Sequence, residues 1–183
     1  MEALSKQQLL ALLAAARAHS ERDWLMILVG YSHGLRSSEV IGIMGDDVQD
    51  GFLSVCRLKG SNRTVQPLIS DGDPLLDERK SLIELSRNRG GNQRLFPVTR
   101  RTFGRVMARH ALAAGIPQHL AHPHILKHTI AMQTIHSAGI ENVRQYLGHK
   151  SMSSTGAYLR KTDAEASAAI GHALKGRKRK RRV

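Results

Sequence analysis

The stretch at residues 52–69, FLSVCRLKGSNRTVQPLI, decides the fold class of this chain. Two apolar runs with β-branched residues, 52–58 and 64–69, flank a polar and basic turn at 59–63. This composition predicts a β-hairpin. Aspartates and a glycine at 46–51 supply turn chemistry just before it, so the helical pattern upstream ends there.

On both sides of the hairpin the sequence predicts helices. Ser5 and Gln8 have the S-x-x-Q spacing of a capping box, which marks the start of the first helix. Glycines at 90–91 and the Gly-Ile-Pro sequence at 115–117 separate later segments. The fold class is therefore mainly α with a small antiparallel β-sheet (α+β). The predicted helices cover about residues 5–18, 22–32, 37–43, 73–88, 100–114, 123–137, 141–147, 153–159 and 163–174.

Length and composition indicate one globular domain, at 1–174, followed by a basic tail at 175–183. The longest apolar stretch, 24–31, is too short to span a bilayer, and the first residues lack the basic start of a secretory signal. The single cysteine, Cys56, excludes an internal disulfide framework and fits a reducing compartment. We therefore expect a cytoplasmic protein with no membrane partner.

The chain is strongly basic, with 28 Lys and Arg against 15 Asp and Glu and a formal net charge of +13. The tail, KGRKRKRRV, accounts for seven of these charges, so the rest of the chain is basic in its own right. Cationic surfaces bind phosphate backbones because each neutralised phosphate releases counterions. Charge alone therefore favours a nucleic-acid partner over a merely solvated basic surface.

Several polar side chains are candidates for chemistry, although each taken alone has an ordinary structural explanation. Arg36 precedes a predicted helix start and can simply pair with Glu39. His124, Lys127 and His128 share one helical face by their i, i+3, i+4 spacing. A lone tyrosine is more often a core residue than a nucleophile. In chain order the candidates are Arg36, Glu39, Lys59, His124, Lys127, His149 and Tyr158.

Together these side chains stand in an order and spacing that resembles the catalytic domain of the tyrosine recombinases. That family includes phage integrases, chromosome-dimer resolution recombinases and fimbrial-switch invertases. The resemblance spans about residues 5–160 and implies the DNA breaking-rejoining fold of that family. Its motifs are GLRSSE at 34–39, Lys59-Gly60 in the hairpin with Pro67-Leu68 closing the next strand, HPHILKHT at 122–129, and LGHKSMSSTGAY at 147–158.

The resemblance implies a catalytic role for each candidate. Arg36 would be the first catalytic arginine, and Lys59 the hairpin lysine that protonates the leaving 5′-oxygen. His124 would be the histidine of an H-x-x-R motif, and His149 the later histidine. Tyr158 would be the nucleophile that cleaves DNA through a 3′-phosphotyrosyl intermediate. Because that bond conserves the energy of the broken linkage and cationic side chains stabilise the phosphorane, neither a cofactor nor a metal is implied.

Two further positions complete the implied site. Glu39 matches an acidic residue that supports the site from behind the first arginine. Lys127 stands where the family has an arginine, so the charge is kept while the planar fork that grips two phosphate oxygens is lost. We expect activity to survive this exchange, because a point charge still stabilises a phosphorane.

The resemblance also implies double-stranded DNA as the partner, with a homotetramer on DNA and a mostly monomeric free protein. Such a protein would be bacterial or phage-encoded and associated with the nucleoid. The family usually carries an N-terminal helical domain, so this chain is expected to be either a fragment or a short recombinase like the fimbrial invertases. The predicted DNA contacts are Arg63 in the hairpin and Arg177, Lys178, Arg179, Lys180, Arg181 and Arg182 in the tail.

Three alternatives stay open beside the recombinase. One is a DNA-binding regulator on the same scaffold, weakened in catalysis by Lys127. Another is a type IB topoisomerase-like enzyme, although the Ala-rich helix predicted at 163–174 is suited to docking on a neighbouring subunit and favours a recombinase. The third is a zinc site at His122, His124 and His128, which we disfavour because no cysteine or acidic ligand lies close in sequence.

Overall fold

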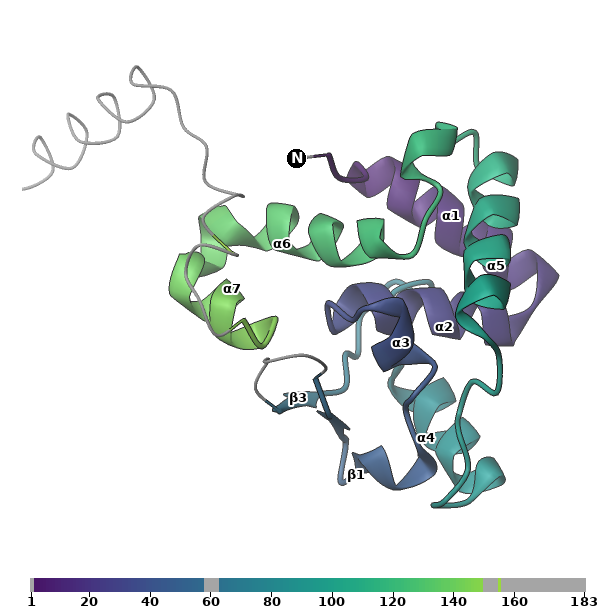
Figure 1. Cartoon of the computed structure of the whole chain (residues 1–183), viewed down its shortest axis with the longest axis vertical. Coiled ribbons are helices and arrows are strands. Elements are labelled where there is room, and N and C mark those ends of the chain that lie inside the picture. Colours follow the sequence, from purple (N-terminus) through teal and green to yellow (C-terminus); the bar gives the residue numbers. More distant parts are fainter. Residues whose placement is uncertain (1, 58–62, 150–154, 156–183) are drawn as a thin grey trace, which may run out of the picture.

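Helices make up most of the molecule, and one small antiparallel sheet lies beside them (Figure 1). The predicted fold class, mainly α with a small antiparallel sheet, is confirmed. The computed structural model describes residues 2–57, 63–149 and 155. The helices are α1 (Lys6–His19), α2 (Glu21–Ser32), α3 (Ser37–Val40), α4 (Arg79–Arg89), α5 (Arg100–Ala113), α6 (His124–Ala138) and α7 (Ile140–Tyr146), with 3-10 turns η1 (Gly45–Asp47) and η2 (Gln118–Leu120); the strands are β1 (Val48–Gln49), β2 (Phe52–Val55) and β3 (Thr64–Pro67).

α1 and α2 are joined at a single residue. α1 begins at the predicted capping box, where the Ser5 hydroxyl accepts a hydrogen bond from the Gln8 amide and the Gln8 side chain accepts one from the Ser5 amide. Ser20 ends α1, and its hydroxyl accepts a hydrogen bond from the Asp23 amide at the start of α2. α2 is buried along most of its length and packs against α1 on one side and α6 on the other. Its continuous apolar composition therefore belongs to a central helix.

The turn that ends α2 requires a glycine. Gly34 has φ +58°, a left-handed backbone conformation that residues other than glycine rarely adopt. A Cβ atom placed there would lie 2.3 Å from Cδ2 of Leu147, so the turn is pressed against the end of α7. Arg36 and α3 follow directly, and the glycine thus sets how closely the α2–α3 turn approaches α7. α3 stops at Val40, earlier than the predicted helix.

The predicted hairpin supplies β2 and β3 of a three-stranded antiparallel sheet with the order β1-β2-β3, in which β2 is the central strand. β2 and β3 pair with Val55 opposite Thr64. β1 adds a strand that the sequence does not predict, because two residues are too short to show an alternation. The turn Asp50-Gly51, with φ +52° and +80°, joins β1 to β2 and has the type I′ geometry that suits a two-residue hairpin.

α4 begins at Arg79, six residues later than the predicted helix at 73–88, so that boundary is wrong. Aspartate side chains hold the preceding segment in turns. Oδ1 of Asp71 accepts a hydrogen bond from the Asp73 amide, and Oδ1 of Asp73 accepts one from the Leu75 amide. These side-chain bonds compete with helical ones and delay the helix.

Two clusters of buried side chains hold the elements together. The larger fills the space between α1, α2, α5, α6 and the sheet. The smaller joins α6 to α7 through Ala131, Ile135, Val143 and Leu147. None of the described helices is long and apolar enough to cross a bilayer. The predicted helices at 153–159 and 163–174 lie outside the described residues, apart from position 155.

Candidate active site

Arg36 occupies the turn between α2 and α3 and is held by Glu39. The Arg36 amide donates a hydrogen bond to Glu39 Oε2 at 2.8 Å, and its guanidinium donates one to Oε1 at 3.0 Å. The Glu39 side chain is fully buried, whereas that of Arg36 stays 35% exposed. Glu39 therefore fixes the base of Arg36 while its guanidinium still faces solvent, an arrangement suited to meeting an anion.

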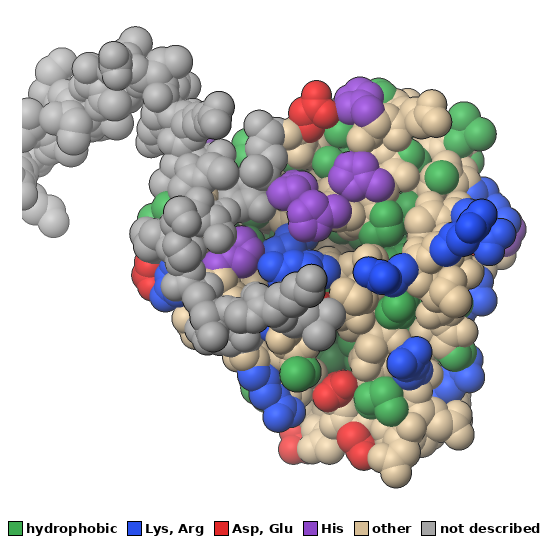
Figure 2. Space-filling view, viewed as in Figure 1, with side chains coloured by type: hydrophobic (Ala, Val, Ile, Leu, Met, Phe, Trp, Pro, Cys, Tyr) green, Lys and Arg blue, Asp and Glu red, His purple; other side chains and the backbone are tan. Residues whose placement is uncertain are grey.

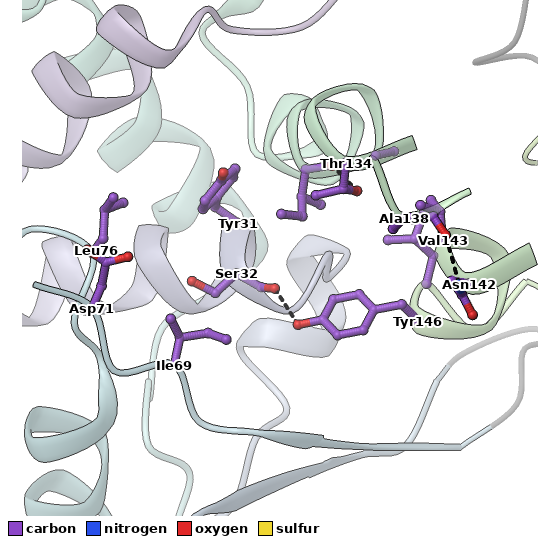
Figure 3. Close-up of a pocket in the computed structure, with 13 residues that line it drawn as sticks. Tyr31, Ser32, Ile69, Asp71, Leu76, Thr134, Ala138, Asn142, Val143 and Tyr146 are labelled. Carbon is purple, nitrogen blue, oxygen red and sulfur yellow. Dashed lines mark hydrogen bonds between the residues drawn. The ribbon is translucent and has the colours of Figure 1, made fainter. Parts of the chain in front are cut away.

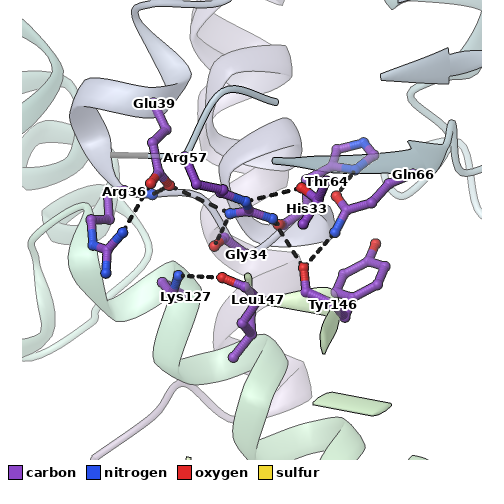
Figure 4. A network of polar contacts seen from close by, with 10 residues as sticks. All are labelled: His33, Gly34, Arg36, Glu39, Arg57, Thr64, Gln66, Lys127, Tyr146 and Leu147. Atoms are coloured by element: carbon purple, nitrogen blue, oxygen red, sulfur yellow. Dashed lines mark hydrogen bonds and ion pairs between the residues drawn. The ribbon is translucent and has the colours of Figure 1, made fainter. Parts of the chain in front are cut away.

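Arg57 lies directly behind this pair, and its side chain is fully buried (Figure 4). All five N–H groups of its guanidinium have acceptors. Nε donates to the Thr64 hydroxyl at 3.0 Å. One terminal nitrogen donates to the Gly34 carbonyl at 3.0 Å and to Glu39 Oε2 at 3.4 Å, and the other donates to the carbonyls of His33 and Tyr146, both at 3.0 Å.

Arg57 is the residue of this site that no motif in the sequence singles out. Period-2 alternation is the signal that points to it, because Leu53 and Val55 of β2 are buried and residue 57 continues the same face. An arginine on a core-facing position must find internal acceptors, since an unpaired buried charge is costly. Here backbone carbonyls at the ends of α2 and α7 supply most of them.

Lys127 lies on α6 and is 2% exposed. Its ammonium donates a hydrogen bond to the Leu147 carbonyl at 3.1 Å. Burial is the main cause that lowers the pKa of Lys127 to about 7, and the positive charges of Arg57 and Arg36 lower it further against the opposing effect of Glu39. The predicted site lysine thus lies within the cluster, and its ammonium gains or loses a proton near neutral pH.

His149 follows α7 and points into the same cluster. It is 7% exposed, and its Nδ1 forms a 3.0 Å hydrogen bond with the Thr155 hydroxyl. Burial, followed by the charges of Lys127 and Arg36, lowers its pKa to about 4. Thr155, which makes this contact, stands three residues before Tyr158 in the sequence.

His124 begins α6 beside His128, with a ring-centroid distance of 4.4 Å and a perpendicular arrangement. Desolvation and the charge of Lys127 lower the pKa of His124, while desolvation and the neighbouring histidines lower that of His128 to about 4. Figure 2 shows histidines gathered at the centre of one face, next to Lys and Arg side chains. Burial is the main cause of these low pKa values, and the neighbouring positive charges that add to it form a basic surface that suits an anionic ligand.

The structure brings together Arg36, Glu39, Lys127 and His149, with His124 next to them. Arg63 is described but lies on the exposed side of the hairpin, where its Nε donates to the Ser54 hydroxyl at 2.9 Å. The other predicted site residues lie outside the described residues: Lys59, Tyr158, Arg177, Lys178, Arg179, Lys180, Arg181 and Arg182.

A different cluster has the geometry closest to a metal site. Among the described residues, only His19, Asp23 and His110 bring three potential ligand atoms within 4.8 Å of one another, and the predicted zinc alternative around His124 is not among such groups. Arg22 already pairs with Asp23 at 2.7 Å, and Arg109 contacts His19 at 3.3 Å. Two guanidinium groups oppose a divalent cation there, so we interpret the cluster as a polar joint between α1, α2 and α5.

Next to α7, an apolar groove of about 360 Å³ is lined by α2, α6, α7 and the segment at 69–76 (Figure 3). The Tyr146 ring forms part of its wall, and the Tyr146 hydroxyl donates a hydrogen bond to the Ser32 carbonyl at 2.7 Å. Ile130, Thr134 and Ala138 contribute the α6 wall. The groove therefore shares α7 with the candidate active site.

Comparison with known proteins identifies the family to which the chain belongs. The model of the phage integrase family matches residues 2–165. Tyrosine recombinase XerD of Pseudomonas putida is 33% identical over 171 residues, covering 86% of this chain and 56% of the relative. Tyrosine recombinase XerA of Pyrococcus furiosus is 29% identical over 182 residues, covering 94% and 62%. The chain thus spans little more than half the length of these curated relatives.

Solved structures share the fold. A crystal structure of XerA recombinase superposes with a TM-score of 0.72 at 22% identity, covering 94% of this chain and 63% of the other. A lambda integrase dimer bound to a COC′ core site superposes with a TM-score of 0.69 at 21% identity, covering 88% and 50%. The family model covers most of the sequence, and these structures carry the same arrangement of helices and sheet. The chain therefore belongs to the phage integrase family.

Proposed function

We propose that this chain is the catalytic domain of a site-specific tyrosine recombinase, which cleaves and rejoins DNA through a 3′-phosphotyrosyl bond at Tyr158. The observation that carries the proposal is the clustering of Arg36, Lys127 and His149 around one buried carboxylate, Glu39, which pairs with Arg36 and acts electrostatically on the other two. These side chains come from separate parts of the chain. A cluster of cationic and imidazole groups on a basic face matches the charge of a phosphodiester that becomes a phosphorane.

The chain has three tyrosines, and the environment of two disfavours them as nucleophiles. The Tyr31 hydroxyl donates to Gln133 at 2.6 Å, and burial raises its pKa. The Tyr146 hydroxyl donates to the Ser32 carbonyl, and burial raises its pKa to about 12. A nucleophilic phenol needs its phenolate form, which these surroundings oppose. Tyr158 is left as the candidate, nine residues after His149.

The proposed reaction follows from the chemistry of these groups. The Tyr158 oxygen attacks phosphorus, the bond to the 5′-oxygen breaks, and the phenolic proton passes to a base such as His124. Lys59 protonates the leaving 5′-oxygen. Arg36, Lys127 and His149 stabilise the charge on the non-bridging oxygens. Attack by a 5′-hydroxyl on the phosphotyrosine reverses the sequence, so rejoining consumes no external energy source.

The DNA-binding surface proposed here extends from the site along α5. Arg100, Arg101, Arg105 and Arg109 are all exposed, and the last three recur at i, i+4 spacing on one helical face. Lys and Arg side chains share the face of Figure 2 with the central histidines. Such a stripe neutralises successive phosphates, which fixes the position of a duplex without reading its sequence. The substrate would be chromosomal or phage DNA in the bacterial cytoplasm.

We propose that assembly on DNA uses the apolar groove of Figure 3. Its occupant would be the segment at 163–174 of a neighbouring copy, whose small apolar side chains suit a narrow groove. The groove shares α7 with the candidate site, since its lining residues Tyr146 and Leu147 accept hydrogen bonds from Arg57 and Lys127. Binding of a second subunit in the groove would therefore affect the positions of Arg57 and Lys127.

One observation favours the alternative of a DNA-binding regulator. In the free protein the Lys127 ammonium is bound to the Leu147 carbonyl and shielded from solvent. A lysine that is hydrogen-bonded to a carbonyl cannot hold a phosphate as the family's arginine would. Cleavage would then be slow, while DNA binding would stay intact. Covalent trapping separates the two functions.

The test uses a pool of nicked suicide duplexes with a randomised core, because loss of the short fragment traps any covalent adduct. The natural chain is expected to form a denaturant-resistant adduct, and sequencing the retained DNA identifies the site. Tyr158→Phe should form none while binding DNA within a few-fold, and Tyr31→Phe serves as the matched control that keeps the adduct. Binding without any adduct in the natural chain would establish the regulator, and relaxation of supercoiled plasmid by a monomer would indicate a topoisomerase.

A further inference from the structure

We propose that Arg57 is the positioning residue of this site, a buried guanidinium that holds three catalytic parts in register without touching the DNA. The inference rests on the proposed function. The three parts are the Arg36–Glu39 pair, the hairpin arm that carries Lys59, and the end of α7 that leads to His149. Each part accepts a hydrogen bond from a different nitrogen of the Arg57 guanidinium.

The first attachment concerns the arginine turn. Arg57 donates to the carbonyls of His33 and Gly34 and to Glu39 Oε2, whose other oxygen holds Arg36. The carboxylate is thus shared: Oε1 accepts from the Arg36 guanidinium, and Oε2 accepts from both the Arg36 amide and Arg57. If Arg57 were lost, Glu39 would keep its hydrogen bonds to Arg36 but lose the one that Oε2 accepts from Arg57.

The second attachment concerns the hairpin. Arg57 follows β2, two residues before Lys59, and its Nε donates to the hydroxyl of Thr64 at the start of β3. The guanidinium therefore joins the two described residues, 57 and 64, between which Lys59 lies in the sequence. Fixing these two positions relative to the rest of the site favours a productive geometry for a group carried between them.

The third attachment concerns α7. The Tyr146 carbonyl accepts hydrogen bonds from Arg57 at 3.0 Å and from the Gln66 amide at 2.7 Å. The next carbonyl, of Leu147, accepts from Lys127. Two consecutive carbonyls at the end of the helix thus bind two cationic side chains, and His149 follows two residues later. Arg57 thus links the end of α7, three residues before His149, to the turn that carries Arg36.

The five bonds explain why the residue type matters. Lysine at this position would keep the charge, but its ammonium has three N–H donors in place of five and no planar fork. At least two acceptors would lose their partner, and the acceptors lie in different directions. Methionine would keep the approximate volume and lose every donor. The two variants therefore separate the role of charge from the role of geometry.

The experiment measures single-turnover cleavage of the nicked duplex recovered from the trapping selection, at saturating protein, for Arg57→Lys and Arg57→Met. Displacement of catalytic groups by about 1 Å can slow a reaction by about a hundredfold, so we expect that loss for Arg57→Met and a smaller loss for Arg57→Lys. DNA affinity should stay within a few-fold, because Arg57 faces no solvent. Arg17→Met is the control, since Arg17 stacks on Trp24 and contacts the Pro74 carbonyl away from the site.

The pH profile of cleavage distinguishes a positioning role of Arg57 from a merely structural one. Arg57 is the cation that most strongly lowers the pKa of Lys127, after burial itself. Its removal should shift the alkaline limb of the cleavage profile to higher pH in Arg57→Met but leave it in place in Arg57→Lys. If Arg57→Met proves too unstable to study, the cleavage loss in the charge-keeping Arg57→Lys decides the question.

Full cleavage by folded Arg57→Lys and Arg57→Met would overturn the inference. A cleavage loss that merely parallels the loss of folded protein, as in Arg17→Met, would overturn it as well. Absence of an adduct in the natural chain would instead refute the proposed function, so the two failures are distinguishable.

Discussion

At the scale of single residues, Lys127 distinguishes this site most clearly. Its pKa of about 7 means that the ammonium is largely protonated below neutral pH and loses its proton as the pH rises. A bound phosphate favours the charged form, so DNA binding should take up a proton above pH 7. We expect cleavage to decline from about pH 7 to pH 9 by at most about tenfold per unit.

Lys127→Arg should remove this decline, because arginine stays protonated throughout the range. At pH 7 its cleavage rate should be unchanged or higher than that of the natural chain, since the arginine restores a bidentate grip on phosphate. The measurement is the single-turnover rate on the selected nicked duplex across pH 6 to 9. A drop of tenfold or more at pH 7 would show that the site is built around the compact ammonium.

At the same scale, the sequence motifs single out Arg36, Glu39, Lys127 and His149, which lie close together, but they do not predict the hydrogen bonds that hold these residues. The pairing of Arg36 with Glu39 follows from their i, i+3 spacing at a helix start. The bond from Lys127 to the Leu147 carbonyl joins residues 20 apart and depends on how α6 packs on α7. Such tertiary contacts leave no local pattern in the sequence.

At the scale of elements, the contact between the α2–α3 turn and α7 can be tested through one glycine. Gly34→Ala places a methyl group 2.3 Å from Leu147 and imposes a side chain on a left-handed backbone. The backbone conformation alone should cost about 1–2 kcal/mol of the free energy of unfolding, and the clash adds to it. Urea unfolding followed by circular dichroism measures the loss.

Gly104→Ala is the matched control for this substitution. Gly104 lies within α5, and a Cβ atom there meets nothing within 4 Å. Alanine in a helix interior should stabilise by about 0.5–1 kcal/mol relative to glycine. Equal stability changes in the two variants would contradict the close approach of the turn to α7.

Elements also differ in how well the sequence predicts them. α1 and α5 match their predicted ranges within about a turn, because a capping residue and an apolar periodicity act together. α4 does not, since aspartate side chains at 71 and 73 hold the chain in turns that periodicity does not reveal. β1 is too short to produce a pattern.

At the scale of the whole molecule, the excess of positive charge should govern DNA affinity. Deleting residues 176–183 removes six basic side chains. If all six contact phosphate, the slope of log affinity against log salt should fall by roughly five, at about 0.9 per contact. Filter binding to random-sequence duplex between low and physiological salt measures the slope. An unchanged slope would mean that the tail does not lie on DNA.

Assembly can be tested at the apolar groove. Ala138→Asp introduces a charge into its wall at an exposed position, so the fold should tolerate it while docking of an apolar segment should not. Ser137→Asp adds the same charge one residue away, outside the lining. Sedimentation with a two-site duplex should show weaker assembly for Ala138→Asp than for Ser137→Asp or the natural chain. A chain cut after Arg160 should assemble as weakly as Ala138→Asp. Equal assembly of all four proteins would refute docking in the groove.

Ser20 carries a consequence for how related sequences can vary. It closes α1 with its backbone and opens α2 with its hydroxyl, so no spare residue lies between the two helices. One inserted residue would separate the two caps or turn α2 by about 100° relative to α1. Because α2 delivers Arg36, natural length variation among homologues should avoid this joint. Insertions and deletions should accumulate instead in the aspartate-rich turns before α4, where side chains rather than packing define the backbone.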